Sequence, residues 1–331
     1  MRVTVLTTSY PRDANDVAGA FIATSVDGLQ ALGTHVDVVS PATFWHGGIA
    51  YGGGIAHNLR SAPWRLALVP AFLFAYARAA RAASRDADLI HAHWIPSAIA
   101  ARTTGKPYVL QVWGTDIELA RRLPALARPA LRRARAVLAA SEFLASAAEE
   151  LGARHVRVVP PGVAIPTSVG EADRPPHVLF AGRLSPEKGI LEFLAATEGL
   201  PRRIVGDGPL RAEVPEARGF VAPSEMSHEY ARAAVVCVPS RREGYGFSAR
   251  EALAHGRAVV ASAVGGLADL AGPGVVLVPP GEIAALRSEV TRLLEDDAAR
   301  ERLGAEARAR AVAELSPEVA ARRLLAVYES V

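Results

Sequence analysis

Short apolar runs rich in Val, Ile and Leu alternate along this chain with longer stretches in which Ala, Leu and Arg recur at helical spacing. Such alternation is typical of βαβ units, in which helices join parallel strands and cover the sheet, so we expect an α/β fold. In the first half, strands are predicted at residues 3–7, 36–39, 89–91, 108–112, 136–139 and 156–159. In the second half, they are predicted at residues 178–180, 203–205, 235–238, 258–261 and 275–278.

A segment rich in Pro and Gly, residues 160–170, interrupts this alternation and indicates a linker. The chain has 331 residues, and single hydrophobic cores stop growing at roughly 250–300 residues. We therefore expect two doubly wound, Rossmann-like parallel-sheet domains facing a central cleft, over residues 1–168 and 172–315. Helix starts with an N-cap serine followed by proline are predicted at Ser185 and Ser316, and the second would open a closing helix over residues 316–331.

The small net charge of +3 conceals an uneven distribution, because residues 1–165 carry +6 and residues 166–331 carry −3. A basic first half favours an anionic partner such as an acidic lipid, or it is a solvated arginine-rich surface. The same two interpretations apply to one crowded helical region, which holds Arg121, Arg122, Arg128, Arg132, Arg133 and Arg135. We expect no nucleic-acid partner, and peripheral contact with an acidic membrane stays open.

The longest apolar stretch, residues 66–77, lies between two arginines. It is shorter than the roughly 20 residues that a membrane-spanning helix needs, and the chain starts directly in a strand pattern without a signal peptide. The single cysteine, Cys237, lies in an apolar run and is expected to be a buried hydrophobe. We therefore expect a cytoplasmic chain, peripheral to the inner membrane face if its basic helices dock there.

The densest candidate for a binding site is the run over residues 243–256, which follows a predicted strand. Gly244 and Gly246 allow the backbone to approach a ligand closely, and a helix is predicted to begin near Gly246. The N–H groups of Phe247 and Ser248 at that helix start would suit a phosphate. Taken alone, this run also fits a glycine-capped helix with two solvated glutamates.

Two glutamates in this run have different positions relative to the helix start. Glu243 lies in the loop, where it would face a ligand near the phosphates. Glu251 lies one to two turns into the helix, where it would face a more distant diol such as a ribose, whose two hydroxyls a carboxylate can accept.

Two cations follow the first strand of the second half, Arg183 and Lys188. The chain contains only one other lysine, Lys106, so a lysine here is unusual for its composition. A diphosphate leaving group gains negative charge as its bond to a sugar breaks, and two fixed cations at a helix start can stabilise that charge without a metal. A solvated basic pair is the alternative.

The run Glu243-Gly-Tyr-Gly-Phe-x3-Glu251-Ala-Leu-Ala-x-Gly256 resembles the signature of glycosyltransferase family 4, whose members are retaining enzymes of the GT-B fold. The run Gly182-Arg183-Leu-x3-Lys188-Gly189 resembles a second motif of the same family. The resemblance implies that Glu243, with Gly244, Tyr245 and the helix start, lies near the transferred sugar and phosphates. It also implies that Glu251 lies near the ribose, and that Gly206 and Asp207 belong to a turn lining the base.

The first half resembles the family more diffusely. The resemblance implies that His93 is a catalytic-site histidine touching the transferring sugar or the acceptor, although a strand histidine with satisfied hydrogen bonds is the alternative. It implies that Asp116 belongs to a substrate-binding element and that Gly19 closes a loop reaching the donor phosphates. The closing helix after Ser316 would, by the same resemblance, return to the first domain.

The expected function is retaining transfer of a sugar from a nucleoside-diphosphate sugar to the hydroxyl of an unidentified acceptor, a glycan, a lipid-linked molecule or a small molecule. We expect catalytic roles for His93, Glu243, Arg183 and Lys188, with no metal site and no cofactor. An epimerase or phosphorylase on the same fold and a non-catalytic sugar-binding protein remain alternatives. A dinucleotide-dependent oxidoreductase would need Gly-x-Gly-x-x-Gly after the first strand, and residues 7–12 lack it.

Overall fold

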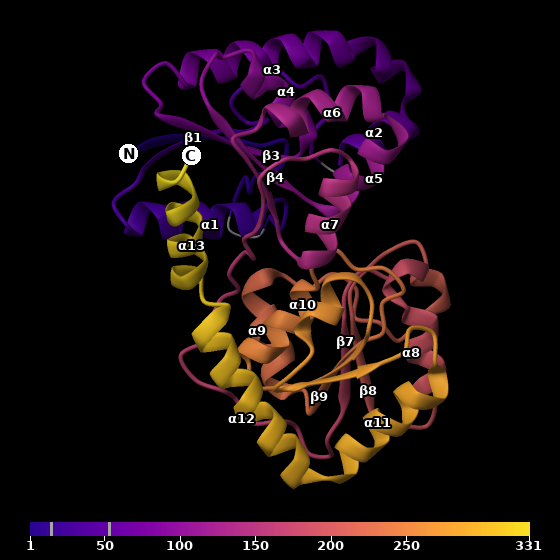
Figure 1. Ribbon diagram of the computed structural model, residues 1–331. Helices are drawn as coiled ribbons and strands as arrows, with labels where there is room; N and C mark the ends of the chain where they lie inside the picture. Colours follow the sequence, from indigo (N-terminus) through magenta and orange to yellow (C-terminus); the bar gives the residue numbers. More distant parts are fainter. Residues whose placement is uncertain (14–15, 52–53) are drawn as a thin grey trace. The chain divides into compact units, whose positions relative to one another are not determined.

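The computed structural model describes residues 1–13, 16–51 and 54–331 and contains two compact units (Figure 1). The N-terminal unit comprises Met1–Pro161 with Ala320–Val331, and the C-terminal unit comprises Gly162–Val319. Most of the segment predicted as a linker belongs to the C-terminal unit. Val163 lies in the core of that unit, and its N–H donates a hydrogen bond to the Leu315 carbonyl (2.8 Å).

The N-terminal unit is built on a six-stranded parallel sheet of order β2-β1-β3-β4-β5-β6. Its strands are β1 (Arg2–Leu6), β2 (His35–Val39), β3 (Leu89–His93), β4 (Tyr108–Val112), β5 (Ala136–Ala139) and β6 (Val156–Val158). Its helical elements are α1 (Ala20–Ala31), α2 (Ile55–Ser61), η1 (Pro63–Leu68), α3 (Val69–Ala83), α4 (Ile95–Arg102), α5 (Gly114–Arg122), α6 (Pro124–Arg133) and α7 (Glu142–Glu150). The apolar faces of β1, β3 and β4 pack against α1 to form its core.

The last helix, α13 (Pro317–Glu329), returns to the N-terminal unit. It begins at the predicted serine cap, where Ser316 Oγ accepts a hydrogen bond from the Val319 N–H (3.2 Å). Leu324, Val327 and Tyr328 on its buried face pack into the core of the N-terminal unit.

The C-terminal unit has a five-stranded parallel sheet of order β11-β10-β9-β7-β8. Its strands are β7 (Val178–Ala181), β8 (Arg202–Val205), β9 (Val235–Val238), β10 (Ala258–Ser262) and β11 (Val275–Val278). Its helical elements are η2 (Pro186–Lys188), α8 (Ile190–Ala196), η3 (Arg211–Glu213), α9 (Pro223–Arg232), α10 (Phe247–Ala254), η4 (Gly265–Leu270), α11 (Ile283–Glu295) and α12 (Asp297–Glu314). Most residues of these strands are buried and apolar, although β8 begins with Arg202 and Arg203, and these short apolar runs made the strands predictable.

One prediction about the N-terminal unit is wrong. The apolar stretch expected to be too short for a membrane is part of a longer helical stretch, because η1 continues directly into α3. The combined stretch, Pro63–Ala83, has 21 residues and is long and apolar enough to cross a membrane by length and composition alone. Only 17% of its most apolar window is buried in the protein.

Candidate functional site

The carboxyl ends of β7, β8 and β9 carry three loops that the structure brings into contact in the C-terminal unit. A Cβ atom at Gly206, after β8, would overlap the carbonyl of Gly182, after β7. A Cβ atom at Gly189 would overlap the carbonyl of Pro239, after β9. Both glycines also have positive φ angles (138° and 72°), so this close approach depends on their lack of a side chain.

The central contact of this site is an ion pair between its two predicted motifs. Lys188 Nζ donates to Glu243 Oε2 across 2.6 Å, although the residues are 55 positions apart in the sequence. The Glu243 side chain is 11% exposed and the Lys188 side chain 32% exposed, so the pair faces a partly open space. Ser240 Oγ lies 3.5 Å from the same carboxylate oxygen.

The predicted helix start at Ser185 is confirmed in position, with Ser185 as the N-cap followed by Pro186, but it opens no regular α-helix. Pro186–Lys188 forms only a short 3₁₀ turn, without a hydrogen bond from the Ser185 side chain to cap it. Gly189 then takes a left-handed conformation, and α8 begins one residue later. Arg183 is exposed in the loop before this turn, and Lys188 is the last residue of the turn, so neither cation lies at the start of a regular helix.

The helix start predicted near Gly246 is confirmed. Gly246 is the N-cap of α10 with a φ angle of 86°, and the helix begins at Phe247. Tyr245 is buried, and the Arg250 guanidinium lies 3.7 Å from the centre of its ring. Arg250 also donates to the carbonyls of Tyr245 and Gly266, so this buried arginine holds the glycine turn in place from within the core. Sequence analysis did not identify Arg250.

Glu251 lies on α10, where Tyr230 of α9 holds its carboxylate. The Tyr230 hydroxyl donates to Glu251 Oε2 across 2.8 Å. Burial raises the pKa of Glu251, and this hydrogen bond partly opposes the rise. Tyr230 is fully buried, so its hydroxyl gives the carboxylate a fixed orientation before any ligand arrives. Sequence analysis also missed Tyr230, which lies 21 positions before its partner.

The turn at Gly206 and Asp207 is held by its own polar groups. The Asp207 carbonyl accepts a hydrogen bond from the Leu184 N–H (2.9 Å), which ties the turn to the loop after β7. The Asp207 carboxylate accepts from the Gly208 N–H (2.7 Å). These bonds place the exposed Asp207 at the rim of the same loop cluster.

In the N-terminal unit, His93 lies at the carboxyl end of β3 and is almost fully buried. Its ring lies 4.1 Å from that of His91 and is nearly parallel to that of Trp113 at 6.2 Å. Burial, and then the neighbouring His91, lower the pKa of His93 well below its usual value, so the imidazole is neutral. His91 has a partner for Nδ1, the Tyr328 hydroxyl at 2.7 Å, whereas His93 Nδ1 has no hydrogen-bond partner within the described part of the chain.

Asp116 and Gly19 lie at the starts of two helices of the N-terminal unit. Asp116 Oδ1 accepts from the Trp113 N–H (2.7 Å) and so caps α5. Burial raises the pKa of Asp116 to about 7, although several backbone hydrogen bonds lower it. Gly19 is the N-cap of α1, where a Cβ atom would overlap the Ser9 carbonyl. Gly19 thus closes the loop after β1, of which residues 14–15 lie outside the described residues.

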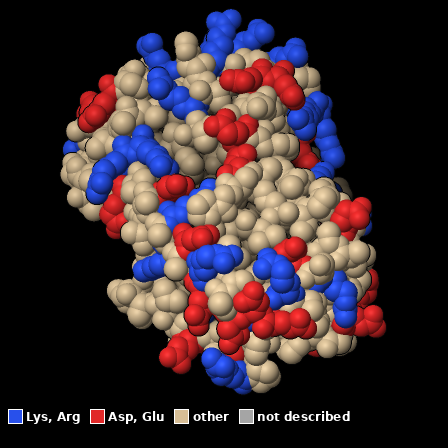
Figure 2. All heavy atoms as spheres, turned by 60° about the horizontal axis from the view of Figure 1, so that its bottom comes forward, with Lys and Arg blue, Asp and Glu red and all other residues tan. Residues whose placement is uncertain are grey.

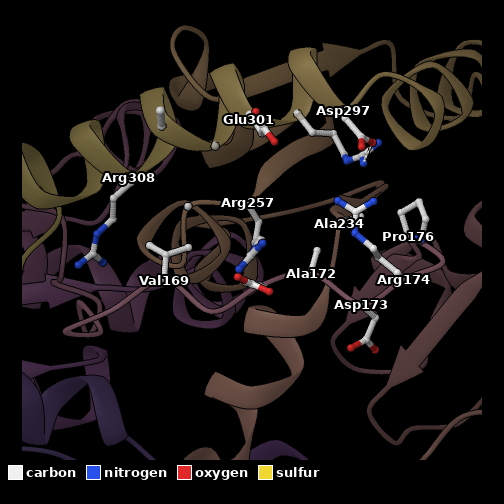
Figure 3. Close-up of a pocket in the computed structure, with 15 residues that line it drawn as sticks. Val169, Ala172, Asp173, Arg174, Pro176, Ala234, Arg257, Asp297, Glu301 and Arg308 are labelled. Carbon is white, nitrogen blue, oxygen red and sulfur yellow. Dashed lines mark hydrogen bonds and ion pairs between the residues drawn. The ribbon is translucent and has the colours of Figure 1, made fainter.

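A cavity of about 560 Å³ lies at the opposite end of the C-terminal sheet, near the amino ends of β7, β9 and β10. Figure 3 shows basic and acidic side chains around it, among them Arg257, Arg308, Asp297 and Glu301. Arg308 donates to the carbonyls of Ala254 and Pro166, and Arg257 donates to the carbonyl of Gly170. Arg308 fastens Pro166 to α12, and Arg257 fastens Gly170 to the turn before β10, so we assign this cavity a structural role. In residues 1–13, 16–51 and 54–331, His, Cys, Asp and Glu form no cluster of three or more that could hold a metal ion.

Two protein-family models together match most of the chain. The model described as "Glycosyltransferase Family 4" matches residues 18–165, and the one described as "Glycosyl transferases group 1" matches residues 164–310. The junction between the two matches falls within a few residues of the structural boundary at Gly162.

Individual proteins agree with these models. The chain is 32% identical to 2-deoxystreptamine glucosyltransferase of Streptomyces kanamyceticus, over 64% of this chain and 69% of that protein. It is 28% identical to a Bacillus subtilis protein assigned to teichuronic acid biosynthesis as the glycosyltransferase TuaC, over 88% and 89% of the two chains. Among solved structures, it resembles Anabaena HepE (Alr3699) in complex with UDP-glucose, with a TM-score of 0.75, 19% identity and 100% of both chains covered.

Proposed function

Because this chain belongs to the group 1 glycosyltransferases of family 4, with two α/β units of the GT-B fold, we propose that it transfers a sugar from a nucleoside-diphosphate sugar to an acceptor hydroxyl, with retention at the anomeric carbon. The observation that carries this proposal is the Lys188–Glu243 ion pair, at the carboxyl ends of the strands and on the loop that leads into α10. In open α/β sheets, ligands bind at this edge.

The proposed chemistry breaks the bond between the sugar C1 and the diphosphate and forms a bond from C1 to the acceptor oxygen. Between the breaking of the first bond and the formation of the second, the sugar has oxocarbenium character. The acceptor proton leaves with the diphosphate. Lys188, Arg183 and the N–H groups of Phe247 and Ser248 would stabilise the charge that grows on the diphosphate, in place of a metal ion. Glu243, released from Lys188 by the incoming phosphate, would face the sugar.

We propose that the acceptor hydroxyl enters beside His93. A neutral imidazole accepts or donates one hydrogen bond without adding charge. Because the pKa of His93 is lowered well below its usual value, its imidazole is neutral near neutral pH. Asp116 would orient the substrate from the start of α5, and Gly19 would allow the loop after β1 to approach the donor phosphates. Gly206 and Asp207 would line the base.

The test is a binding and turnover assay with a panel of nucleoside diphosphates. UDP heads the panel, followed by GDP and ADP, because the similar Anabaena structure holds UDP-glucose. The matching diphosphate should stabilise the protein by about 2.7 kcal/mol at a hundredfold excess over Kd, measured as a thermal shift. Release of diphosphate from the matching sugar donor should require an acceptor hydroxyl and should persist in EDTA.

Three other outcomes of this assay would contradict the proposal. Conversion of the donor alone into a second nucleotide sugar would identify an epimerase, and a requirement for inorganic phosphate would identify a phosphorylase. Thermal stabilisation without turnover on a broad acceptor panel would identify a binding protein.

The proposed ribose contact gives a separate prediction. Glu251→Gln should raise the KM for the donor about tenfold with little change in kcat, because a hydrogen bond to a charged group is worth roughly 1.5–3 kcal/mol and a neutral one about 1 kcal/mol. Steady-state kinetics with varied donor measure both constants. Glu225→Gln, at an exposed position in the first turn of α9, is the matched control and should leave both unchanged. A fall in kcat with an unaltered KM would place Glu251 at the reacting sugar instead.

A further inference from the structure

A long part of the N-terminal unit lacks acidic residues. From Val38 to Arg85 the sequence contains no Asp or Glu, and it contains Arg60, Arg65, Arg78, Arg81 and Arg85. Over much of the rest of the chain the two signs alternate, except in residues 119–141, which hold six arginines and no acid. Figure 2 shows Lys and Arg side chains interspersed with Asp and Glu side chains over the face that it presents. The region from Val38 to Arg85 therefore has a positive charge that no acid within it compensates.

The same region exposes large apolar side chains. On η1 and α3, Trp64 is 65% exposed, Leu66 58% and Phe74 71%. With the exposed Ala67, Pro70 and Ala71, they form what we call the η1–α3 face, which Arg78 and Arg81 extend at one end. Exposed apolar side chains that form one patch indicate an interaction site, whereas singly scattered ones do not. The η1–α3 face is therefore a candidate interaction site.

The other side of α3 belongs to the core of the N-terminal unit. We therefore infer that this helix would lie in the plane of a membrane surface and would not cross the membrane. Phe72, Tyr76 and Ala80 are buried on that side, and α4 lies beneath α3 (Figure 1). The Tyr76 hydroxyl donates to Ser97 Oγ (2.7 Å), and its ring stacks on Phe44 at 4.6 Å. Insertion of the whole stretch across a bilayer would break these contacts.

We propose that the η1–α3 face docks on an anionic phospholipid bilayer. Aromatic and aliphatic side chains on one face with arginines beside them are what an in-plane interfacial helix presents to headgroups and acyl chains. The Arg65 guanidinium lies 5.5 Å from the Trp64 ring, so a cation accompanies this exposed tryptophan. Charge complementarity favours anionic lipid, because each arginine near such a surface adds to the attraction. This proposal is independent of the donor and of the reaction.

The basic helices α5 and α6, for which the sequence left membrane contact and a solvated surface both open, fit this role less well. They also expose Leu119, Leu123 and Leu126. Their charge is partly neutralised, however, because Arg121 pairs with Glu150 (3.2 Å) and α5 contains Glu118. For this reason we propose the η1–α3 face, rather than α5 and α6, as the membrane-binding surface.

The experiment is co-sedimentation of the full chain with vesicles of phosphatidylcholine, with and without phosphatidylglycerol. The wild type should bind the mixed vesicles, bind pure phosphatidylcholine weakly, and dissociate as salt is raised. Arg78→Glu should reduce the bound fraction at least about tenfold, because one attractive charge is lost and one repulsive charge is gained. Phe74→Ser should reduce it about tenfold through lost apolar insertion. Arg78 is preferred to Arg81, which donates to the Thr103 carbonyl.

Two matched variants serve as controls. Phe220→Ser removes another exposed phenylalanine, in the C-terminal unit, and Arg122→Glu reverses a charge on α5. Both should bind the mixed vesicles as the wild type does, and all four variants should keep the wild-type unfolding midpoint. Equal binding to both vesicle types, no binding to either, or a loss at Arg122 without one at Arg78 would overturn the proposal. So would a vesicle-free dimer that Phe74→Ser dissociates, because the face would then cover a second copy.

Discussion

Replacement of Lys188 by Ala should lower kcat/KM for sugar transfer about 10²–10³-fold, the loss seen when one fixed donor to a developing anion is removed. The charge on the diphosphate is largest in the transition state, so most of the loss should appear in kcat. The ion pair with Glu243 supports this expectation, because it holds the ammonium group at the loop that leads into α10. Steady-state kinetics with the donor identified in the binding panel measure the effect.

Lys106→Ala is the matched control, because Lys106 is the only other lysine in the sequence and lies in the N-terminal unit. It should retain full activity. Since loss of Lys188 leaves the mostly buried Glu243 carboxylate without its partner, unfolding midpoints must be compared as well. Lys188→Arg keeps the charge and should recover part of kcat. An active Lys188→Ala enzyme with an unchanged midpoint would refute the assignment of Lys188 to the leaving group.

The sequence was sufficient to locate this loop cluster because of the geometry of parallel sheets. Each buried strand is a short run of apolar residues, and the residues that follow it must meet at the carboxyl edge. Residues near 183, 188, 206 and 243 each follow a predicted strand, so their proximity follows from strand order and does not require knowledge of any side-chain contact.

What the sequence did not predict are the groups that act from within the core. Arg250 and Tyr230 hold the glycine turn and Glu251 through hydrogen bonds between different elements, and no periodicity marks them. The 3₁₀ turn at Pro186–Lys188 was missed because a serine-proline start resembles a regular helix start, whereas Gly189 ends the turn through tertiary contact with Pro239. Apart from the Arg250 bond to Tyr245, five positions away, each deciding contact joins residues distant in sequence.

Asp116 offers a large predicted effect of pH on stability near neutral pH. Its carboxyl is 3% exposed, and burial raises its pKa to about 7, against 3.8 for the free side chain. Between these values the folded state keeps a proton that the unfolded state has released. Stability from this group is therefore fully present below about pH 4 and is lost as pH rises to about 7, by on the order of 4 kcal/mol. The buried His91 and His93, whose pKa values are lowered, contribute the opposite slope at acid pH.

Asp116→Asn separates these contributions, because Asn keeps an oxygen to accept from the Trp113 N–H but does not titrate, while the histidines are the same in both proteins. Relative to the wild type, the variant should gain stability as pH rises from about 4 to about 7, by on the order of 4 kcal/mol of unfolding free energy. Tryptophan fluorescence in denaturant measures this, since Trp45, Trp64, Trp94 and Trp113 all lie in the N-terminal unit. Asp86→Asn, at an exposed carboxylate of the same unit, should show a constant difference from the wild type. A constant difference for Asp116→Asn as well would mean that Asp116 is ionised in the folded state throughout.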